Sequence, residues 1–224
     1  MSGLDRWLDA ARTRWEALRV QLTRLTPAPV APDQLASEDA TARWRAVRAL
    51  VQRPRADLLP QLLALTGDDD AMVRASAVDA LVSWGPTVAL ESIRQALAQA
   101  PEPPQATALL EALARLPDPA NRAAITPWLD HSEPGVRAAA FMALAALGED
   151  DDLPVLRRAL KTGDLVMQRA ILAALCAPGA EDLAQRAASS NDPVLRQRGE
   201  QALARIHRAQ TAQTTHPRKH ANDD

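Results

Sequence analysis

Aromatic residues and cysteine are scarce in this chain of 224 residues. It contains no tyrosine, one phenylalanine and one cysteine, and aromatic residues make up 3% of the composition. The single cysteine excludes an internal disulfide framework. Apolar residues still make up 47% of the chain, and most of them are alanine and leucine. This composition favours helices that approach one another closely through small side chains.

The chain also lacks an excess of basic residues and a long apolar run near its start. Its formal net charge is -2, so its overall charge does not indicate binding to nucleic acid or to an anionic lipid surface. The first residues, MSGLDRWLDAARTRW, alternate charged and apolar residues and do not form the continuous apolar stretch of a signal peptide or membrane span. We therefore expect a cytoplasmic protein with no membrane span.

An Ala-Leu pair returns at a nearly constant interval along the chain. The pairs are Ala49-Leu50, Ala80-Leu81, Ala112-Leu113, Ala143-Leu144, Ala174-Leu175 and Ala202-Leu203. Successive leucines are 31, 32, 31, 31 and 28 residues apart. A period in this range indicates repeated units that must stack on one another to bury their apolar faces. We predict an all-α fold, a right-handed α-solenoid of about five antiparallel helix pairs followed by one terminal helix.

Each Ala-Leu pair ends the apolar face of a predicted first helix, which we call the A helix of its repeat. An acid lies eleven residues before each leucine: Asp39, Asp70, Glu102, Glu133, Asp164 and Asp192. An acidic side chain there can accept hydrogen bonds from the free amides of the first helical turn and oppose the positive end of the helix dipole, and Glu caps less well than Asp. The acids therefore mark the helix starts.

A second apolar segment, the B segment, follows each of the first five A helices. The segments read ADLLPQLLAL, VALESIRQAL, NRAAITPWL, DDLPVLRRAL and EDLAQRAA. Proline is tolerated best in the first turn of a helix, and we expect Pro60, Pro127 and Pro154 to lie early in their B segments.

The chain divides into four parts. Residues 1–25 carry one apolar stripe and are predicted to form an amphipathic helix that caps the array, or alternatively a helix that docks a partner. Residues 26–36 include TPAPVAPD and are expected to be a proline-rich linker. Residues 37–209 form the repeat array, and residues 210–224 are polar, aperiodic and expected to be disordered.

The repeats resemble short HEAT-like repeats of the type named after phycobilisome lyases. The strings that carry the resemblance are DAMVRASAVDAL, EPGVRAAAFMAL, DLVMQRAILAAL and DPVLRQRGEQAL. The resemblance implies A helices on the outside, B helices lining a concave side, and a ladder of motif arginines between repeats. The matching positions are Arg43, Arg74, Arg137 and Arg196. The alternative for these arginines is an anion-binding stripe, but a structural role beside the recurrent acids fits better.

Three enzyme families with similar repeats offer possible activities. Deoxyhypusine hydroxylases hold iron with His-Glu pairs, but no histidine here precedes a glutamate. Phycobilin lyases share the repeats, yet their pocket residues are not part of the repeat motif. Alkylpurine DNA glycosylases use aromatic and basic residues on a concave face, as Trp44, Trp84 and Trp128 with the nearby arginines 43, 45, 48, 53 and 55 could. Nucleic-acid binding and a lyase or oxidoreductase accessory role therefore remain alternatives.

Other candidate reactive groups have structural explanations. Cys176 ends an A helix without a nearby histidine and is expected to be an inert, mostly buried thiol rather than a nucleophile. The acidic runs at 67–70 and 148–152 lack the alternating ligands of a calcium loop and precede helices. His216 and His220 supply too few ligands for a metal. We expect no catalytic residue, cofactor or metal.

The sequence thus favours a non-catalytic scaffold that binds a protein partner on its curved surface. The exposed B-segment positions expected to contact this partner are Glu91, Arg94, Gln95, Arg122, Arg157, Arg158, Lys161 and Arg186. Arg94 and Arg157 occupy equivalent positions and Arg186 lies close to the next one, which suggests a basic stripe for an acidic helix or loop. A solvated face without a ligand explains the same residues equally well. Partner identity and oligomeric state are not encoded in any recognisable motif.

Overall fold

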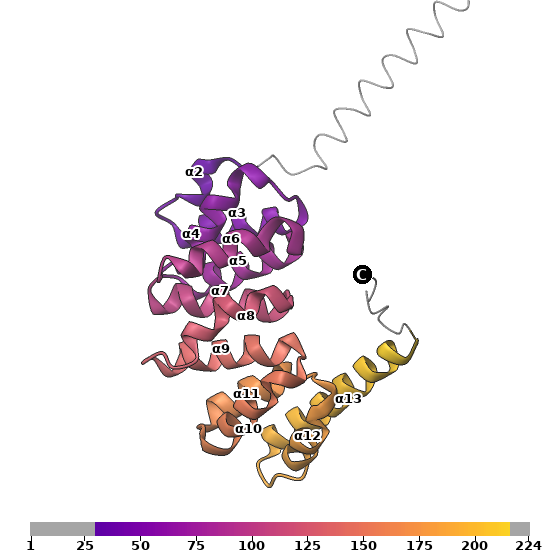
Figure 1. Cartoon of the computed structure of the whole chain (residues 1–224). Coiled ribbons are helices and arrows are strands. Elements are labelled where there is room, and N and C mark those ends of the chain that lie inside the picture. Colours follow the sequence, from indigo (N-terminus) through magenta and orange to yellow (C-terminus); the bar gives the residue numbers. More distant parts are fainter. Residues whose placement is uncertain (1–29, 216–224) are drawn as a thin grey trace, which may run out of the picture.

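The computed structural model describes residues 30–215, and these form a stack of helices without any strand (Figure 1). Helices follow one another from the indigo end to the yellow end as a successive pile, with each repeat resting on the one before it. The all-α solenoid expected from the repeat period is therefore confirmed. The predicted capping helix at residues 1–25 and the end of the tail, residues 216–224, lie outside the described residues.

The six A helices begin where the recurrent acids predicted. They are α3 (Ala40–Gln52), α5 (Ala71–Trp84), α7 (Pro103–Arg115), α9 (Pro134–Leu147), α11 (Leu165–Ala174) and α13 (Pro193–Thr215). The four aspartates accept hydrogen bonds from first-turn amides, at 2.9 Å from Thr41 to Asp39 and 2.8 Å from Met72 to Asp70, for example. Glu102 and Glu133 make no such bond. The longer glutamate side chain is the poorer cap, as its chemistry predicts.

Four of the five B segments contain 3₁₀ turns and are less regular than the A helices, whereas the second is one continuous α-helix. They comprise η1 (Ala56–Leu58), α4 (Leu59–Ala64) and η2 (Leu65–Gly67); α6 (Pro86–Ala98); η3 (Pro119–Asn121), α8 (Arg122–Ile125) and η4 (Thr126–Trp128); η5 (Asp150–Asp152) and α10 (Leu153–Thr162); and η6 (Pro178–Ala180) and α12 (Glu181–Ala188). Pro60 and Pro154 lie in the first turn, as expected. The expectation for Pro127 is wrong. It lies near the end of its segment, where its missing N–H ends α8 after four residues.

One continuous apolar core runs the length of the array, from Val30 to Ile206. Successive A helices pack directly on one another, while B segments contact their B neighbours over shorter stretches. Alanines at the A–A contacts are fully buried, as Ala77 and Ala143 show at 0% exposure. Small side chains there allow neighbouring helices to approach closely, which is how an alanine-rich sequence with few aromatics fills its interior.

The folded array extends beyond the predicted limits at both ends. Within the expected linker, residues Pro32–Leu35 form the short helix α2, and Val30 and Leu35 are buried in the core. Arg55 holds this segment by donating a hydrogen bond from Nη1 to the carbonyl oxygen of Val30, at 3.1 Å. At the other end, α13 continues to Thr215 instead of stopping near residue 209. The first repeat is therefore covered by a short helix. Its residues lie in the segment whose proline-rich composition predicts a linker.

Two glycines are required by the geometry of the stack. Gly148 follows α9 with φ of +70°, the left-handed conformation that glycine adopts without steric cost. Gly199 lies where α13 crosses α12, and a Cβ there would come within 2.3 Å of the backbone nitrogen of Ala188. No side chain fits between these two helices at that point, so α12 and α13 are held at their closest approach.

Candidate partner-binding surface

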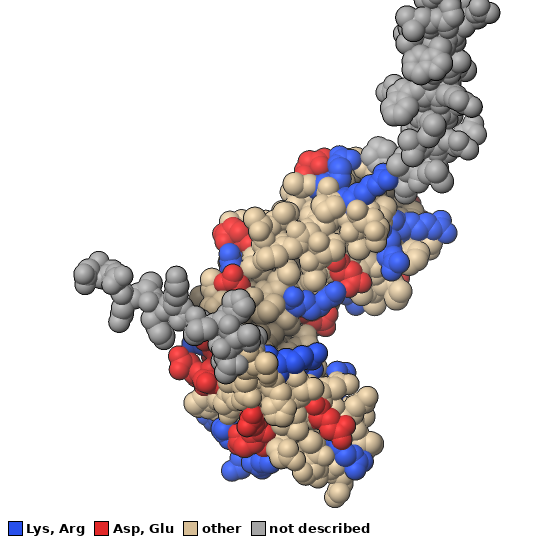
Figure 2. Space-filling model, turned by 90° about the vertical axis from the view of Figure 1, so that its right-hand side faces the viewer, with Lys and Arg blue, Asp and Glu red and all other residues tan. Residues whose placement is uncertain are grey.

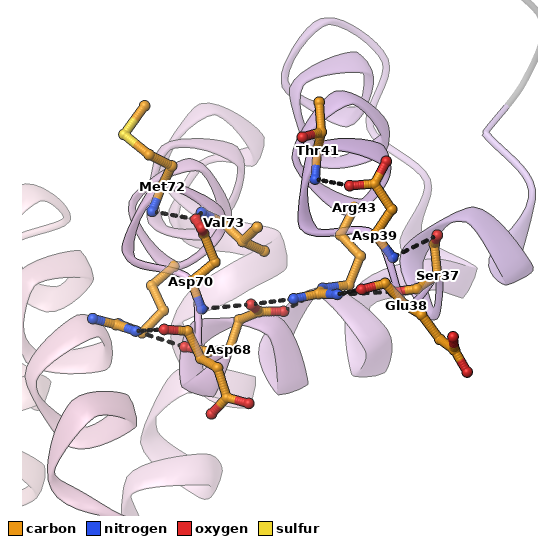
Figure 3. Close-up of polar contacts among 11 residues, drawn as sticks. Ser37, Glu38, Asp39, Thr41, Arg43, Asp68, Asp70, Met72 and Val73 are labelled. Carbon is orange, nitrogen blue, oxygen red and sulfur yellow. Dashed lines mark hydrogen bonds and ion pairs between the residues drawn. The ribbon is translucent and has the colours of Figure 1, made fainter.

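The motif arginines mainly fasten the turns that connect repeats. Arg74 and Arg137 each donate from Nη1 to the carbonyl oxygens five and six residues earlier, at 2.6 to 3.0 Å. Arg43 does the same and also reaches Asp68 of the next repeat with two hydrogen bonds of 2.7 Å, as Figure 3 shows. Of the four positions expected to form an inter-repeat ladder, Arg43 is thus the one whose side chain joins two repeats within the described part of the chain. An arginine committed in this way is not available to bind an external anion.

A second set of side-chain bonds joins successive B segments. The pairs are Arg94 with Asn121 at 2.9 Å, Arg122 with Asp152 at 3.0 Å, and Arg157 with Asp182, whose Nη2–Oδ1 distance is 2.7 Å. We call these pairs the B ladder. Three of the eight predicted contact residues therefore already link one repeat to the next. Their primary role is to fix the angle between neighbouring B segments.

The two best-buried carboxylates of these networks differ in their electrostatics. Asp68, 6% exposed, loses hydration on burial, but hydrogen bonds from Arg43 and from the Asp70 amide outweigh this and lower its pKa. Asp152, 9% exposed, has one partner, Arg122, whose own side chain is 39% exposed. Burial therefore dominates, and the pKa of Asp152 is raised. The surroundings of Asp68 stabilise its charged form, whereas burial destabilises the charged form of Asp152.

Three predicted contact residues, Arg158, Lys161 and Arg186, are exposed and have no side-chain partner within the described part of the chain. Lys161 and Arg186 line a groove of about 200 Å³ between α10, α11, α12 and α13, and Arg157 of the B ladder lies at the same groove. The partly exposed Leu160 and Leu195 and the buried Leu172 and Leu183 form its floor. We call this the distal groove. It combines a basic rim with an apolar floor.

Arg158 lines a second, wider groove of about 960 Å³, which we call the proximal groove. It lies between α9, α10 and the start of α11, and its apolar lining includes Phe141, Val155 and Met167. Val155 is 44% exposed. The proximal groove therefore offers an apolar surface that no described side chain covers.

The remaining predicted contact residues do not join these grooves. Glu91, Arg94 and Gln95 form a separate cluster on α6, in which Glu91 accepts from Arg94 at 3.1 Å and from Gln95 at 2.9 Å. Arg122 belongs to the B ladder between the two groups. Its partner acid neutralises it, so a basic stripe running unbroken from α6 to α12 does not form. The distribution on the face drawn in Figure 2 agrees, since basic and acidic side chains of the described residues alternate there across broad uncharged areas.

The tryptophans near the basic N-terminal repeats have structural roles. Trp84 is 7% exposed and donates from Nε1 to the carbonyl oxygen of Leu50 at 2.8 Å, which joins α5 to α3. Trp128 is 9% exposed. Trp44 is half-buried beneath Arg48, whose guanidinium carbon lies 5.6 Å from the ring centroid. Trp84 and Trp128 therefore present little ring surface on which a nucleic-acid base could stack.

Cys176 and the acidic runs are engaged in the fold. The Cys176 thiol faces the carbonyl oxygens of Ala145 and Ala146, and burial raises its pKa, which disfavours the reactive thiolate. Asp150 accepts a bond of 2.8 Å from the Gly179 amide, across a repeat boundary. Within residues 30–215, no group of three or more His, Cys, Asp or Glu side chains is placed to hold a metal ion. No helix in that range combines the length and apolar character that crossing a bilayer requires.

The apolar lining of the grooves is what sequence reasoning missed. Leu172, Leu183 and Leu195 appear in the sequence as ordinary core positions of their helices, and periodicity does not distinguish a leucine at the edge of a groove from one in the interior. The last repeat interval is 28 residues instead of 31 or 32, and the distal groove lies at that junction. The proximal groove lies at an interval of 31 residues, so the repeat length does not identify the grooves.

Comparison with known proteins bears on the fold and the family. No curated protein matches the chain. Among solved structures, it is similar to the crystal structure of an engineered protein, with 19% sequence identity and a TM-score of 0.42 over 79% of this chain and 95% of that one. The sequence matches the family described as HEAT repeats over residues 29–109 and 90–176. Since these matches span well over half of the 224 residues, the chain belongs to the HEAT repeat family.

Proposed function

We propose that this protein is a non-catalytic interaction scaffold that binds a protein partner across the proximal and distal grooves. The observation that carries the proposal is the convergence of Arg158, Lys161 and Arg186 on these two grooves. They come from two B helices, are exposed, and have no described partner. An apolar floor with an unpaired charged rim matches the anatomy of protein interfaces.

The rest of the molecule supports a role based on shape. Arg94, Arg122 and Arg157 hold successive B segments at fixed angles through the B ladder. A solenoid held in this way presents a preformed surface, which lowers the entropic cost of binding. In their Val-Arg and Ala-Leu pattern, these units resemble the short HEAT-like repeats named after phycobilisome lyases, and we propose that they are of this type. No observation favours a lyase or glycosylase activity over partner binding.

Capture of partners from a lysate of the source cells tests the proposal. The full chain carrying Arg158→Glu, Lys161→Glu and Arg186→Glu is compared with the wild type, each immobilised at equal density. We expect proteins retained by the wild type to be lost, because three attractive charges become repulsive at the rim of the interface. Mass spectrometry of the retained fraction provides the measurement, and circular dichroism verifies equal helicity.

The matched control reverses three exposed arginines outside both grooves, Arg45, Arg48 and Arg208. It changes the net charge by the same amount, so a nonspecific charge effect would appear in both variants. Retention by the control together with loss in the groove variant supports the proposal. If the groove variant retains the same proteins as the wild type, the grooves are not the binding surface.

A further inference from the structure

We infer that the partner segment is an acidic amphipathic helix that lies along the array and places one apolar anchor in each groove, two anchors seven residues apart. The inference rests on the proposed function and specifies its partner. It depends on two observations and one estimate: the two grooves lie at corresponding positions of consecutive repeats, the surplus of their unpaired charge is positive, and the spacing of packed helices matches a helical period.

The proximal and distal grooves occupy the same place in consecutive repeats. A shift of 31 residues carries Leu129, Asp130, Arg137 and Phe141 of the proximal groove onto Leu160, Lys161, Gln168 and Leu172 of the distal groove. A shift of 28 residues carries Arg158, Ala159, Thr162 and Met167 onto Arg186, Ala187, Ser190 and Leu195. Eight pairs of lining positions thus correspond. The two grooves therefore occupy equivalent places in consecutive repeats and are not two unrelated depressions.

This repetition fixes the spacing that a ligand must match. Packed helices lie about 8 to 10 Å apart, so equivalent points on consecutive repeats are separated by about this distance. A helix rises 1.5 Å per residue, and about seven residues, close to two full turns, cover the same distance. Residues i and i+7 of one helix point to the same side. A helical segment laid along the stack can therefore fill both grooves from one apolar face, with i+3 or i+4 between them.

The charge of the grooves selects an acidic segment. Arg158, Lys161 and Arg186 are unpaired within the described residues, and Asp130 is the one acidic lining residue without a described partner. The other charged groups are engaged: Arg137 with backbone carbonyls, Arg157 with Asp182, and Asp164 with the Met167 amide. The unpaired charged side chains of the two grooves therefore sum to a net positive charge. Glutamates and aspartates flanking the apolar anchors would complement it.

The floor of the grooves favours a peptide over a nucleic acid or a small anion. Eight large apolar residues are among those that line them: Leu129, Phe141, Val155, Met167, Leu160, Leu172, Leu183 and Leu195. The distal groove, at about 200 Å³, is smaller than the 300 to 1,000 Å³ typical of sites for drug-sized ligands and suits a single large apolar side chain. A phosphate backbone would leave this apolar floor without a complementary surface.

The amphipathic N-terminal segment of the chain itself is a poor match for this surface. Residues 1–25 contain five arginines and three acids, so the segment carries a net positive charge of two. A basic segment would meet Arg158, Lys161 and Arg186 with like charge, which opposes docking. The charge of the sequence therefore excludes this segment as the complementary ligand and leaves an acidic helix from another protein.

Three pools of displayed 18-residue peptides test the inference on the full chain. All carry leucine at i, i+4 and i+7 within an alanine-rich helical background, and their polar positions are randomised as acidic, basic or uncharged. We expect selection to enrich the acidic pool. Fluorescence anisotropy with a selected acidic peptide should show affinity at least tenfold weaker for the double variant Arg158→Glu/Arg186→Glu and for Val155→Glu. Moving the second anchor from i+7 to i+5 should abolish binding, because that residue faces another side of the helix.

Met72→Glu is the matched control for Val155→Glu, since Met72 is 63% exposed on α5 and lines neither groove. It should leave the affinity unchanged. Enrichment of the basic or uncharged pool, failure to enrich any pool, or acidic peptides that bind all variants equally would each overturn the inference. If partner capture still depends on the three cations while the acidic peptides fail, the scaffold proposal stands and the acidic helix is wrong. If capture is also insensitive to them, both are wrong.

Discussion

The A helices and the B segments of this array differ in how they pack and in how they are joined to their neighbours. A helices are long, begin at acids and pack directly on one another through fully buried alanines and leucines. Four of the five B segments contain 3₁₀ turns, and B segments join one another through the side-chain bonds of the B ladder. The A layer therefore supplies most of the apolar core. The B layer, with fewer helix-to-helix contacts, keeps side chains free at its surface.

This difference explains why candidate binding residues gather on α10 and α12. A residue inside a tight A–A contact cannot change without disturbing the stack, because packed interiors tolerate little change in volume. A residue on the exposed side of a B helix is limited mainly by solubility. Arg158, Lys161 and Arg186 therefore experience few structural constraints. Mutations in the two layers should have clearly different effects on stability.

The most severe test of this difference places an arginine in the A layer. Ala143 on α9 is fully buried, and Ala143→Arg adds a long cation to a contact between neighbouring helices. Overpacking costs about 1 to 3 kcal/mol, and burying an unpaired charge adds to this, so we expect a loss of more than about 3 kcal/mol in the free energy of unfolding. Urea unfolding followed by circular dichroism provides the measurement.

Gly135→Arg is the control for this variant, because it adds the same side chain to the same helix. A Cβ at Gly135 meets no atom within 4 Å, and the residue is exposed. Replacing a helical glycine there should leave stability unchanged or raise it by about 0.5 to 1 kcal/mol. Equal destabilisation by both arginines would show that α9 is not the packed centre of the A layer.

The same difference determined which parts of the fold could be predicted. A-helix starts follow from local chemistry, since Asp39, Asp70, Asp164 and Asp192 cap the turns they immediately precede. The prolines near Leu35 predict a linker, yet tertiary packing buries this residue. Pro127 is expected early in its B segment but lies in the second half of that segment. Local signals located the helices that carry their own caps and misplaced segments ordered by contacts distant in sequence.

The sequence predicts which residues of the candidate surface are exposed. It does not predict which of them form ion pairs with a neighbouring repeat. The sequence identified Arg157, Arg158, Lys161 and Arg186 as exposed positions of B helices, and they are exposed. It could not separate Arg157, which is paired with Asp182, from Arg158 beside it. Which of two adjacent arginines finds an acid depends on the angle between α10 and α12. That angle depends on contacts between residues distant in sequence, including the B ladder itself, and has no local sequence signature.

A smaller difference in stability is expected between removing the ion pair Arg43–Asp68 at the A-layer turn and removing the exposed pair Arg157–Asp182 of the B ladder. Asp68→Asn leaves the half-buried Arg43 without its charged partner and weakens two hydrogen bonds of 2.7 Å. We expect a loss of about 1 to 3 kcal/mol, the usual cost of leaving a buried polar group unsatisfied. Thermal unfolding at low salt provides the measurement, with a lower Tm as the expected result.

Asp182→Asn is the matched substitution in the B ladder, where Arg157 and Asp182 are 45% and 51% exposed. Water replaces the lost partner there, so we expect no resolvable change in Tm. Equal losses for both variants would mean that the exposed pair contributes as much as the buried one. The assignment of the B ladder to orientation rather than stability would then be wrong.

The pH dependence of stability gives the finest comparison, because Asp68 and Asp152 should act in opposite directions. The pKa of Asp68 is lowered on folding, so its contribution is present above its ordinary value near 3.8 and is lost as the pH falls through the folded pKa. The pKa of Asp152 is raised on folding, so its contribution is present below 3.8 and is lost as the pH rises through the folded pKa. As the pH rises from 3 to 7, Asp68→Asn should become more destabilising relative to the wild type, whereas Asp152→Asn should become less destabilising.

Urea unfolding of the three proteins at both pH values measures the difference. The same direction for both variants would show that Arg122 stabilises the charge of Asp152 as fully as Arg43 stabilises that of Asp68, although Arg122 is the more exposed partner.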